Sequence, residues 1–108
     1  MERTGTVRIP SHREATHPGQ VLLEDFLVPL KLTQKDLASA IRVPFQRVNE
    51  LVSGKRGVTP STALRLAKYF GNSPVFWLNL QMRCDLQSAM KKERTELSRI
   101  KQIRKLAA

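Results

Sequence analysis

The sequence predicts an all-α domain of five helices joined by short connections. Three observations support this fold class. Apolar residues recur at helical spacing, proline and glycine mark the starts and ends of the helical segments, and no segment alternates as a strand would. A chain of 108 residues with 41% hydrophobic and 26% charged residues can form one small domain with a modest core. We expect that domain over residues 17–90, after a flexible leader (1–16) and before a basic tail (91–108).

The first predicted helix spans about residues 18–29. Pro18 suits its first turn, because the missing N–H is not needed there, and Pro29 suits its end. The apolar residues of this segment fall on one broad face, which is expected to face the core: Val21, Leu22, Leu23, Phe26, Leu27 and Leu30.

The second and third predicted helices span about residues 34–41 and 44–53. Thr33 is the expected N-cap of the second helix, and Asp36, three residues later, completes a capping box. Gly54 ends the third helix. The residues expected to face the core from these two helices are Leu37, Ala38, Ile41, Val48, Leu51 and Val52.

The fourth and fifth predicted helices span about residues 60–70 and 74–90. Each opens with a hydroxyl residue followed by proline, Thr59-Pro60 and Ser73-Pro74, and Gly71 ends the fourth. The apolar residues of the fourth helix are Ala63, Leu64, Leu66, Ala67 and Phe70, and the apolar side of the fifth is expected to carry Phe76, Trp77, Leu80, Cys84 and Leu86. The tail holds seven basic and two acidic residues, and its narrow apolar stripe indicates that it can continue the fifth helix.

The net charge of +10 and the isoelectric point near 10.7 predict an anionic partner. Nucleic acid is the first candidate and a membrane surface is the alternative. No apolar run approaches the ~20 residues that a membrane span needs, and the N-terminus lacks the apolar segment of a secretory signal, so the expected compartment is the cytoplasm. Cys84 is the only cysteine, and His12 and His17 are expected in exposed loops, so neither a metal site nor a cofactor is predicted.

The second and third predicted helices fit the spacing of a helix-turn-helix. Two helices that cross at a steep angle need a small residue at the crossing, apolar residues on the shared face and a tight turn. Counted from Gln34 as position 1 of a twenty-residue unit, Ala38 is the small residue at position 5. The shared apolar positions 4, 8, 10, 15 and 18 are Leu37, Ile41, Val43, Val48 and Leu51.

Two residues depart from the usual pattern of this motif. Arg42 stands where the turn usually has glycine, and a non-glycine residue in the left-handed region costs about 1 kcal/mol, which a packed domain can absorb. Pro44 stands where the next helix usually has a serine or threonine cap worth ~1 kcal/mol, but its fixed φ suits a helix start. Both residues therefore leave the motif intact, and we expect them to influence which DNA sequence is preferred.

In such a unit the N-terminal part of the second helix enters the major groove of DNA. Asparagine and glutamine can pair with adenine, arginine with guanine or a phosphate, and phenylalanine can pack on a thymine methyl. Phe45 is alternatively a partly buried residue at the helix start, and Glu50 is alternatively an acid that orients Arg47 or a neighbouring basic residue. The residues predicted to contact bases are Phe45, Gln46, Arg47, Asn49 and Glu50.

The predicted phosphate contacts lie around this helix. Thr33 and Gln34 start the preceding helix, where unpaired N–H groups and the helix dipole attract a phosphate. Lys35 is a further candidate, and Lys55 and Arg56 follow the recognition helix in a loop. The alternative for these charges is an ordinary solvated surface.

The segments HPGQVL, NELVSGKRG and SPVFWLNLQ, in this order, resemble the HigA-type antitoxins of bacterial toxin–antitoxin modules, within the phage-repressor-like helix-turn-helix superfamily. The resemblance covers about residues 17–86. It implies a protein that binds operator DNA as a homodimer, represses its own operon and neutralises a HigB-type, mRNA-cleaving toxin. The positions that match the DNA-contacting residues of the family are Gln34, Gln46, Arg47, Asn49, Lys55 and Arg56.

The last predicted helix is more apolar than one small domain requires, and a dimer would use the surplus. The predicted dimer contacts are Phe76, Trp77, Leu80 and Cys84. A two-fold dimer presents two recognition helices about one DNA turn apart, ~34 Å, and so predicts a palindromic operator. The alternative for Trp77 is a place in the core of the monomer.

Four functions compete at this level. The first is an antitoxin that represses its own operon and inhibits a toxin, and the second is a solitary repressor-like regulator without a toxin partner. An enzyme is disfavoured because Cys84, the histidines and the acids form no catalytic constellation at any motif spacing. A module that binds RNA or a toxin but not DNA is left open by Arg42 and Pro44. The leader and the tail are the candidate toxin-binding segments.

Overall fold

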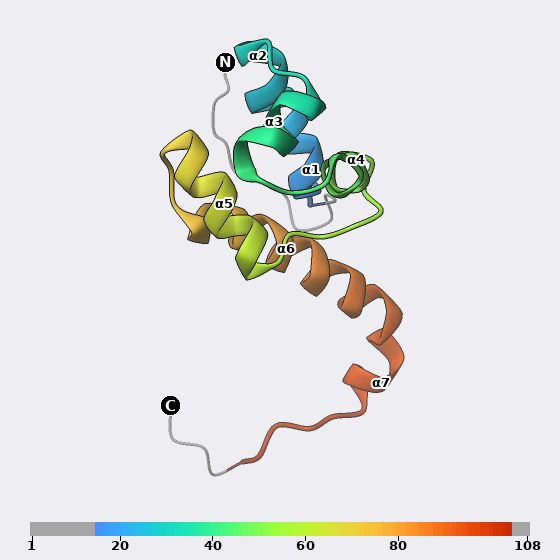
Figure 1. Cartoon of the computed structure of the whole chain (residues 1–108). Coiled ribbons are helices and arrows are strands. Elements are labelled where there is room, and N and C mark those ends of the chain that lie inside the picture. Colours follow the sequence, from blue (N-terminus) through green and yellow to red (C-terminus); the bar gives the residue numbers. More distant parts are fainter. Residues whose placement is uncertain (1–14, 105–108) are drawn as a thin grey trace.

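Figure 1 shows residues 15–104, the part of the chain that this computed structural model describes, as a bundle of helices from which a long arm extends. Within this range there is no strand, which confirms the predicted all-α fold, and no helix is both long and apolar enough to span a bilayer. Residues 1–14 of the predicted leader and residues 105–108 of the predicted tail lie outside the described range. The elements in chain order are α1 (Pro18–Val21), the π-helix η1 (Leu22–Leu27), α2 (Val28–Leu30), α3 (Gln34–Ile41), α4 (Phe45–Val52), α5 (Pro60–Phe70), α6 (Pro74–Lys92) and α7 (Arg94–Ser98).

The predicted first helix is one helical run in three pieces, α1, η1 and α2. Pro29 has no N–H, and in a regular α-helix its ring would collide with the carbonyl four residues earlier. The run is wider there, because the N–H of Val28 donates to the carbonyl of Leu23, five residues back. The helix passes through Pro29 and stops after Leu30, because the next residue, Lys31, has a left-handed φ of 57°.

α3 and α4 form the predicted helix-turn-helix. Arg42 has a φ of 64° and a ψ of 50°, the left-handed conformation expected where this turn usually has glycine. Its N–H donates to the carbonyl of Ser39 (3.3 Å), and the N–H of Val43 donates to the carbonyl of Ala38 (3.0 Å), the two hydrogen bonds of a Schellman motif. Pro44 is the N-cap of α4, in an extended conformation and without a side-chain cap bond.

The guanidinium of Arg65, on α5, closes the same turn. Its Nη1 donates to the carbonyl oxygens of Ile41 (2.8 Å) and Arg42 (3.3 Å). The last carbonyls of a helix have no intrahelical partner, and a cation near them also interacts favourably with the helix dipole. The left-handed conformation of Arg42 is therefore supported from a different helix.

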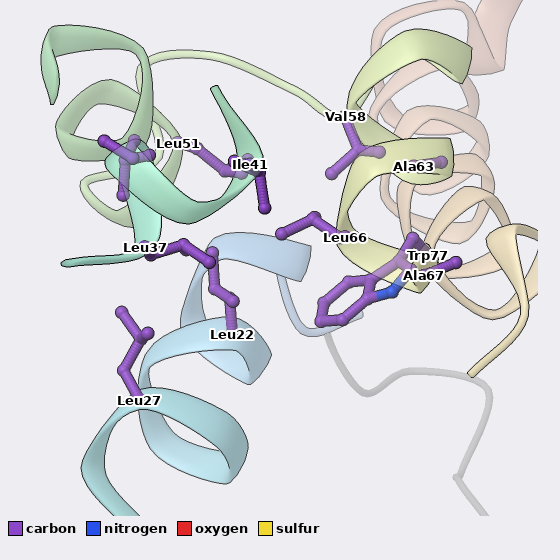
Figure 2. Packing of buried hydrophobic residues seen from close by; sticks show 12 residues of the cluster. Leu22, Leu27, Leu37, Ile41, Leu51, Val58, Ala63, Leu66, Ala67 and Trp77 are labelled. Atoms are coloured by element: carbon purple, nitrogen blue, oxygen red, sulfur yellow. The ribbon is translucent and has the colours of Figure 1, made fainter. Parts of the chain in front are cut away.

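The apolar faces of the helices meet in one core, to which η1, α3, α4, α5 and α6 contribute side chains (Figure 2). Its largest member, Trp77, is 0% exposed. The indole N–H of Trp77 donates to Oδ1 of Asn72 at 3.0 Å, so its polar atom is satisfied. The buried apolar residues are Leu22, Leu27, Leu37, Ala38, Ile41, Val48, Leu51, Val58, Ala63, Leu66, Ala67 and Trp77.

Three leucines of the predicted apolar faces are exposed: Leu30, Leu64 and Leu86. Each belongs to an apolar stripe that is wider than the face its helix buries. Helical periodicity identifies the stripe, but the width of the contact is set by the neighbouring helices.

Gly19 sets the distance between α1 and α4. A Cβ atom added at this position would lie 1.8 Å from the carbonyl oxygen of Leu51, near the end of α4. No side chain can be accommodated at that distance, because the obstacle is backbone and not a side chain that can rotate away. Gly19 therefore allows α1 to pack directly against the recognition helix.

His17 is the N-cap of α1, so the prediction of an exposed loop histidine is wrong. Its Nδ1 atom accepts a hydrogen bond from the N–H of Gly19 at 2.8 Å, and the side chain is partly buried. His12 lies outside the described residues. Burial lowers the pKa of His17 below its usual value, although the nearby carboxylate of Asp85 acts in the opposite direction. Protonation of Nδ1 would remove the acceptor and with it the cap.

Stability should therefore depend on pH through His17. A pKa lowered by folding gives a stabilisation that is fully present above the ordinary histidine pKa of ~6.5 and is lost as the pH falls through the lower pKa of the folded state. The variant His17→Asn keeps a capping oxygen that does not titrate. We expect the thermal midpoint of the wild type to fall more than that of His17→Asn between pH 7.5 and 5, by an amount that corresponds to about 1 kcal/mol. Parallel pH dependence of the two proteins in calorimetry would contradict this role of His17.

α6 is apolar on two opposite sides. Its inner side carries Trp77 and the partly buried Leu80 into the core. At 100° per residue, the opposite side carries Val75, Met82, Leu86 and Met90, which are between 50% and 61% exposed. We call these four residues the outer stripe of α6. The helix ends at Lys92, Glu93 breaks it, and α7 follows as a separate short helix, so the tail continues the fifth predicted helix by only two residues beyond the expected end.

Candidate nucleic-acid interface

The face of α4 that points away from the core carries the predicted base contacts. Phe45, Gln46 and Asn49 are exposed, whereas Arg47 and Glu50 are partly buried. Phe45 is 50% exposed, so a ligand can contact part of its aromatic ring. Val48 and Leu51 on the opposite side are in the core, which fixes the rotation of the helix and the direction in which the polar residues point.

A hydrogen bond joins the two helices of the motif on this exposed side. Nδ2 of Asn49 donates to Oε1 of Gln34, the first residue of α3, at 3.1 Å. Two residues that are 15 positions apart in the chain are thus held together at the surface. The amide of Asn49 retains its carbonyl oxygen, and the amide of Gln34 retains its N–H groups, so the pair presents both a donor and an acceptor.

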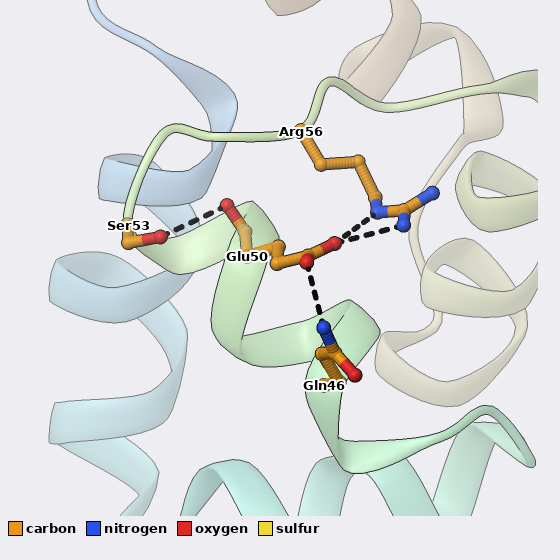
Figure 3. A network of polar contacts seen from close by, with 4 residues as sticks. All are labelled: Gln46, Glu50, Ser53 and Arg56. Atoms are coloured by element: carbon orange, nitrogen blue, oxygen red, sulfur yellow. Dashed lines mark hydrogen bonds and ion pairs between the residues drawn. The ribbon is translucent and has the colours of Figure 1, made fainter.

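Glu50 organises the end of α4 and the loop that follows (Figure 3). Its Oε1 accepts two hydrogen bonds from Arg56, from Nε at 3.0 Å and from Nη2 at 2.8 Å. Its Oε2 accepts a bond from Nε2 of Gln46 at 3.0 Å. The backbone carbonyl of Glu50 accepts from the hydroxyl of Ser53 and from the N–H groups of Lys55 and Arg56. Glu50 therefore orients a neighbouring basic residue, the alternative role predicted for it from the sequence, and this residue is Arg56.

The carboxyl group of Glu50 carries a negative charge at neutral pH. Its hydrogen bonds from Arg56, and secondarily from Gln46, lower its pKa below the usual glutamate value. This carboxylate is an unfavourable neighbour for phosphate, but it cancels part of the charge of Arg56 and holds that guanidinium beside the recognition helix. Gln46 is held in the same way, so two predicted DNA contacts depend on one acid.

The predicted phosphate contacts surround the exposed face of α4. Thr33 caps α3: its Oγ1 accepts from the N–H of Asp36 at 2.9 Å, and its own N–H donates to Oδ2 of Asp36 at 3.3 Å. This confirms the predicted capping box. Lys35, Lys55 and Arg56 are exposed, and Gln34 is partly buried.

The predicted dimer contacts on α6 lie mostly against the domain itself. Trp77 is fully buried and packs against Phe26 and Phe76, with ring centroids 5.0 Å away in both cases, so it cannot contact a second chain. Leu80 is packed against the core. Sγ of Cys84 contacts the carbonyl oxygen of Thr16 at 3.3 Å. The assignment of Trp77 to the dimer interface is therefore corrected in favour of the core, and of the four residues only Phe76 is classed as exposed.

Two structural features were not predicted from the sequence. Arg65 supports the turn of the motif from 23 residues away, and no spacing rule connects the two positions. The outer stripe of α6 escaped because the helix is apolar on both sides, so the periodicity has no single direction. The spacing of Met82, Leu86 and Met90, which recur every four residues, could have indicated this stripe.

Comparisons with known proteins agree with this geometry. Residues 23–77 match a family model described as Helix-turn-helix. The transcriptional regulator YbaQ of Escherichia coli, described as an uncharacterized HTH-type regulator, is 40% identical over 93 residues, 84% of this chain and 82% of YbaQ. Antitoxin HigA-1 of Vibrio cholerae is 37% identical over 90 residues, 82% of this chain and 84% of the antitoxin.

A solved structure is similar as well. The structure of Pseudomonas aeruginosa antitoxin HigA with the higBA promoter superposes with a TM-score of 0.81 at 32% identity, and the match covers 84% of this chain and all of that one. Two of these relatives are named as antitoxins, one of them solved with a promoter, and the third as a transcriptional regulator; the family is not enzymatic. Together with the helix-turn-helix and its exposed polar face, the comparisons show that this chain belongs to the HigA-type family of phage-repressor-like helix-turn-helix proteins.

Proposed function

We propose that this protein is the antitoxin of a type II toxin–antitoxin module. It binds operator DNA as a homodimer, represses its own operon in the bacterial cytoplasm and neutralises a HigB-type, mRNA-cleaving toxin. The observation that supports DNA binding most directly is the exposed amide pair of Asn49 and Gln34 on a helix-turn-helix whose core side is fully packed. The similarity to an antitoxin solved with a promoter supports the same function.

In this proposal the N-terminal half of α4 enters the major groove. Gln46 and Asn49 offer amide groups of the kind that pair with adenine, and the exposed ring of Phe45 offers an apolar contact for a thymine methyl. The N-terminus of α3 and the loop with Lys55 and Arg56 bind phosphates on either side. Because Glu50 holds Arg56 and Gln46, it couples a phosphate contact to a base contact.

The homodimer is proposed to form through the outer stripe of α6. These four residues form one row on a helix whose last turns extend beyond the bundle (Figure 1). Exposed apolar side chains in a contiguous row mark interaction surfaces, and a row on one helix suits pairing with the same helix of a second copy about a two-fold axis. Phe76, the exposed member of the predicted contacts, lies on the same helix.

The variant Leu86→Lys tests this interface. A lysine in the centre of an apolar helix pair leaves a charge without water, so we expect the dimer to weaken at least about tenfold while the fold is retained, since Leu86 is 55% exposed in the monomer. Leu64→Lys is the matched control, because Leu64 is also an exposed leucine, 60% exposed, but lies on α5. Sedimentation over a range of protein concentrations measures both. Equal dissociation constants for the two variants would contradict the proposed interface.

A solitary transcriptional regulator is the second candidate. The similarity to YbaQ, which is described as a transcriptional regulator, favours it. Both candidates require operator binding, and only the antitoxin requires a toxin. A test for a toxin partner therefore distinguishes the two candidates, whereas a test for operator binding does not.

The experiment has two parts. The first measures binding of the purified protein to the promoter of its own operon and to an unrelated duplex of equal length. A preference of less than about tenfold at physiological salt would overturn operator recognition. The second co-expresses the protein with the product of the adjacent small reading frame. Rescue of growth and co-purification support the antitoxin, whereas a promoter-specific protein without such a neighbour is the regulator.

A further inference from the structure

The arm formed by residues 88–104 is as strongly charged as the whole domain that carries it. Residues 15–87 hold nine basic and five acidic side chains, a net charge of +4. Residues 88–104 hold six basic and two acidic side chains, also a net charge of +4, in less than a quarter of the length. The positive charge of this protein is therefore concentrated outside the helix-turn-helix.

Every residue of this arm is exposed. Neither the last turns of α6 nor α7 is covered by the bundle (Figure 1). One ion pair within the arm joins Arg99 to Glu96 at 3.3 Å. Both side chains are more than 70% exposed, so this pair is weak and a phosphate can replace the carboxylate. The basic side chains of the arm are thus presented to solvent as a group.

The helix that carries the arm is attached to the predicted phosphate-binding loop. Oε1 of Gln81, in the middle of α6, accepts a hydrogen bond from the N–H of Val58 at 2.8 Å, and a Cβ at Gly57 would lie 2.8 Å from the same side chain. Val58 and Gly57 directly follow Lys55 and Arg56. From Gln81 to Lys92 the helix rises about 17 Å, half of the ~34 Å pitch of B-DNA. Lys92, near the start of the arm, therefore lies about 17 Å along the helix from the point where the loop is attached, which is about half a turn of B-DNA.

We propose that this arm is a second DNA-binding element, which contacts the phosphate backbone of the duplex flanking the operator. The inference rests on the proposed function, since it presupposes that α4 occupies the operator. Its ligand is the phosphate row of double-stranded DNA, without sequence preference. Its contribution is to affinity and to salt dependence, because each phosphate neutralised by a lysine or arginine releases counterions.

The test compares two duplexes and four proteins, the wild type and three variants. One duplex contains only the operator, and the other has about ten further base pairs of arbitrary sequence on each side. The wild type is compared with Lys92→Gln/Lys101→Gln in the arm and with Lys68→Gln on α5, where the lysine is also exposed. Affinity is measured by fluorescence anisotropy between 50 and 300 mM salt, and circular dichroism checks the fold of each variant.

The wild type is expected to bind the extended duplex about tenfold more tightly than the short one, with a steeper salt dependence. The double variant should lose most of this gain, and its salt slope on the extended duplex should fall by about 2, as expected for two phosphate contacts. Lys68→Gln should retain the gain. If the wild type binds both duplexes equally, or if the two variants behave alike, the arm is not a DNA contact.

The same measurements separate this inference from the proposed function. Specific binding to the short duplex without any gain from the flanks would reject the arm and leave the operator function standing. No specific binding to either duplex would reject both. A third result, in which Ile100→Ser/Ile103→Ser removes the gain and the lysine variants do not, would identify the arm as a protein-docking segment and would also overturn the inference.

Discussion

Replacing Gly19 with alanine is expected to destabilise the domain by about 3 kcal/mol, the upper end of the usual cost of overpacking a core. The added methyl group would lie 1.8 Å from the carbonyl oxygen and 2.7 Å from the carbonyl carbon of Leu51. Because both atoms belong to the backbone of α4, the clash is relieved only if α1 moves away from the recognition helix. For a domain of this size the loss corresponds to a decrease of roughly 12–24 °C in the melting temperature.

Gly71→Ala provides the control for this prediction. Gly71 has a φ of 75°, and a Cβ added there meets nothing within 4 Å, so the substitution carries only the cost of a left-handed alanine, about 1 kcal/mol. Chemical denaturation of both variants gives the two costs directly. If Gly71→Ala is as destabilising as Gly19→Ala, the close approach of α1 to α4 is not what requires the glycine.

The variant Asn49→Ala is expected to bind the operator ~10- to 100-fold more weakly, the range of one lost bidentate base contact. Asn49 is exposed, so its removal leaves the core untouched, but it also leaves Gln34 without its hydrogen-bond partner on the protein. Binding to unrelated DNA should change little, because an amide carries no charge to attract phosphate. Titration of both duplexes at one salt concentration measures this loss of specificity.

Lys55→Ala is the matched comparison for Asn49→Ala. It should weaken binding to the operator and to unrelated DNA by the same factor, and it should reduce the slope of log affinity against log salt by about 0.9. The two variants thus separate sequence recognition from phosphate binding. An Asn49→Ala protein that loses affinity equally for both duplexes would show that this residue is not a base contact.

The helix-turn-helix could be predicted from sequence because its requirements are local. Ala38 at the crossing, the apolar residues around it and the capping box at Thr33 all follow from spacing along one segment, and each is found in the structure. The conformation of Arg42 could also be predicted, because the turn position requires a left-handed backbone whichever residue occupies it.

Contacts between distant segments could not be predicted in the same way. Nothing in the sequence indicates that Gly19 meets the backbone at Leu51, or that His17 caps a helix in preference to lying in a loop. The π-helix before Pro29 depends on where the rest of that helix packs. For Trp77 the sequence left two places open, and the choice between core and interface was made by the direction of α6 relative to α5.

Arg65 has a consequence for how this domain can be engineered. Because its guanidinium binds the carbonyls that end α3, the turn of the motif is completed only after α5 has docked. The segment from Gln34 to Val52 therefore lacks one of the side chains that stabilise its own turn. A graft that transfers operator specificity to another scaffold has to include Arg65 of α5, or a glycine at position 42 that makes this arginine dispensable.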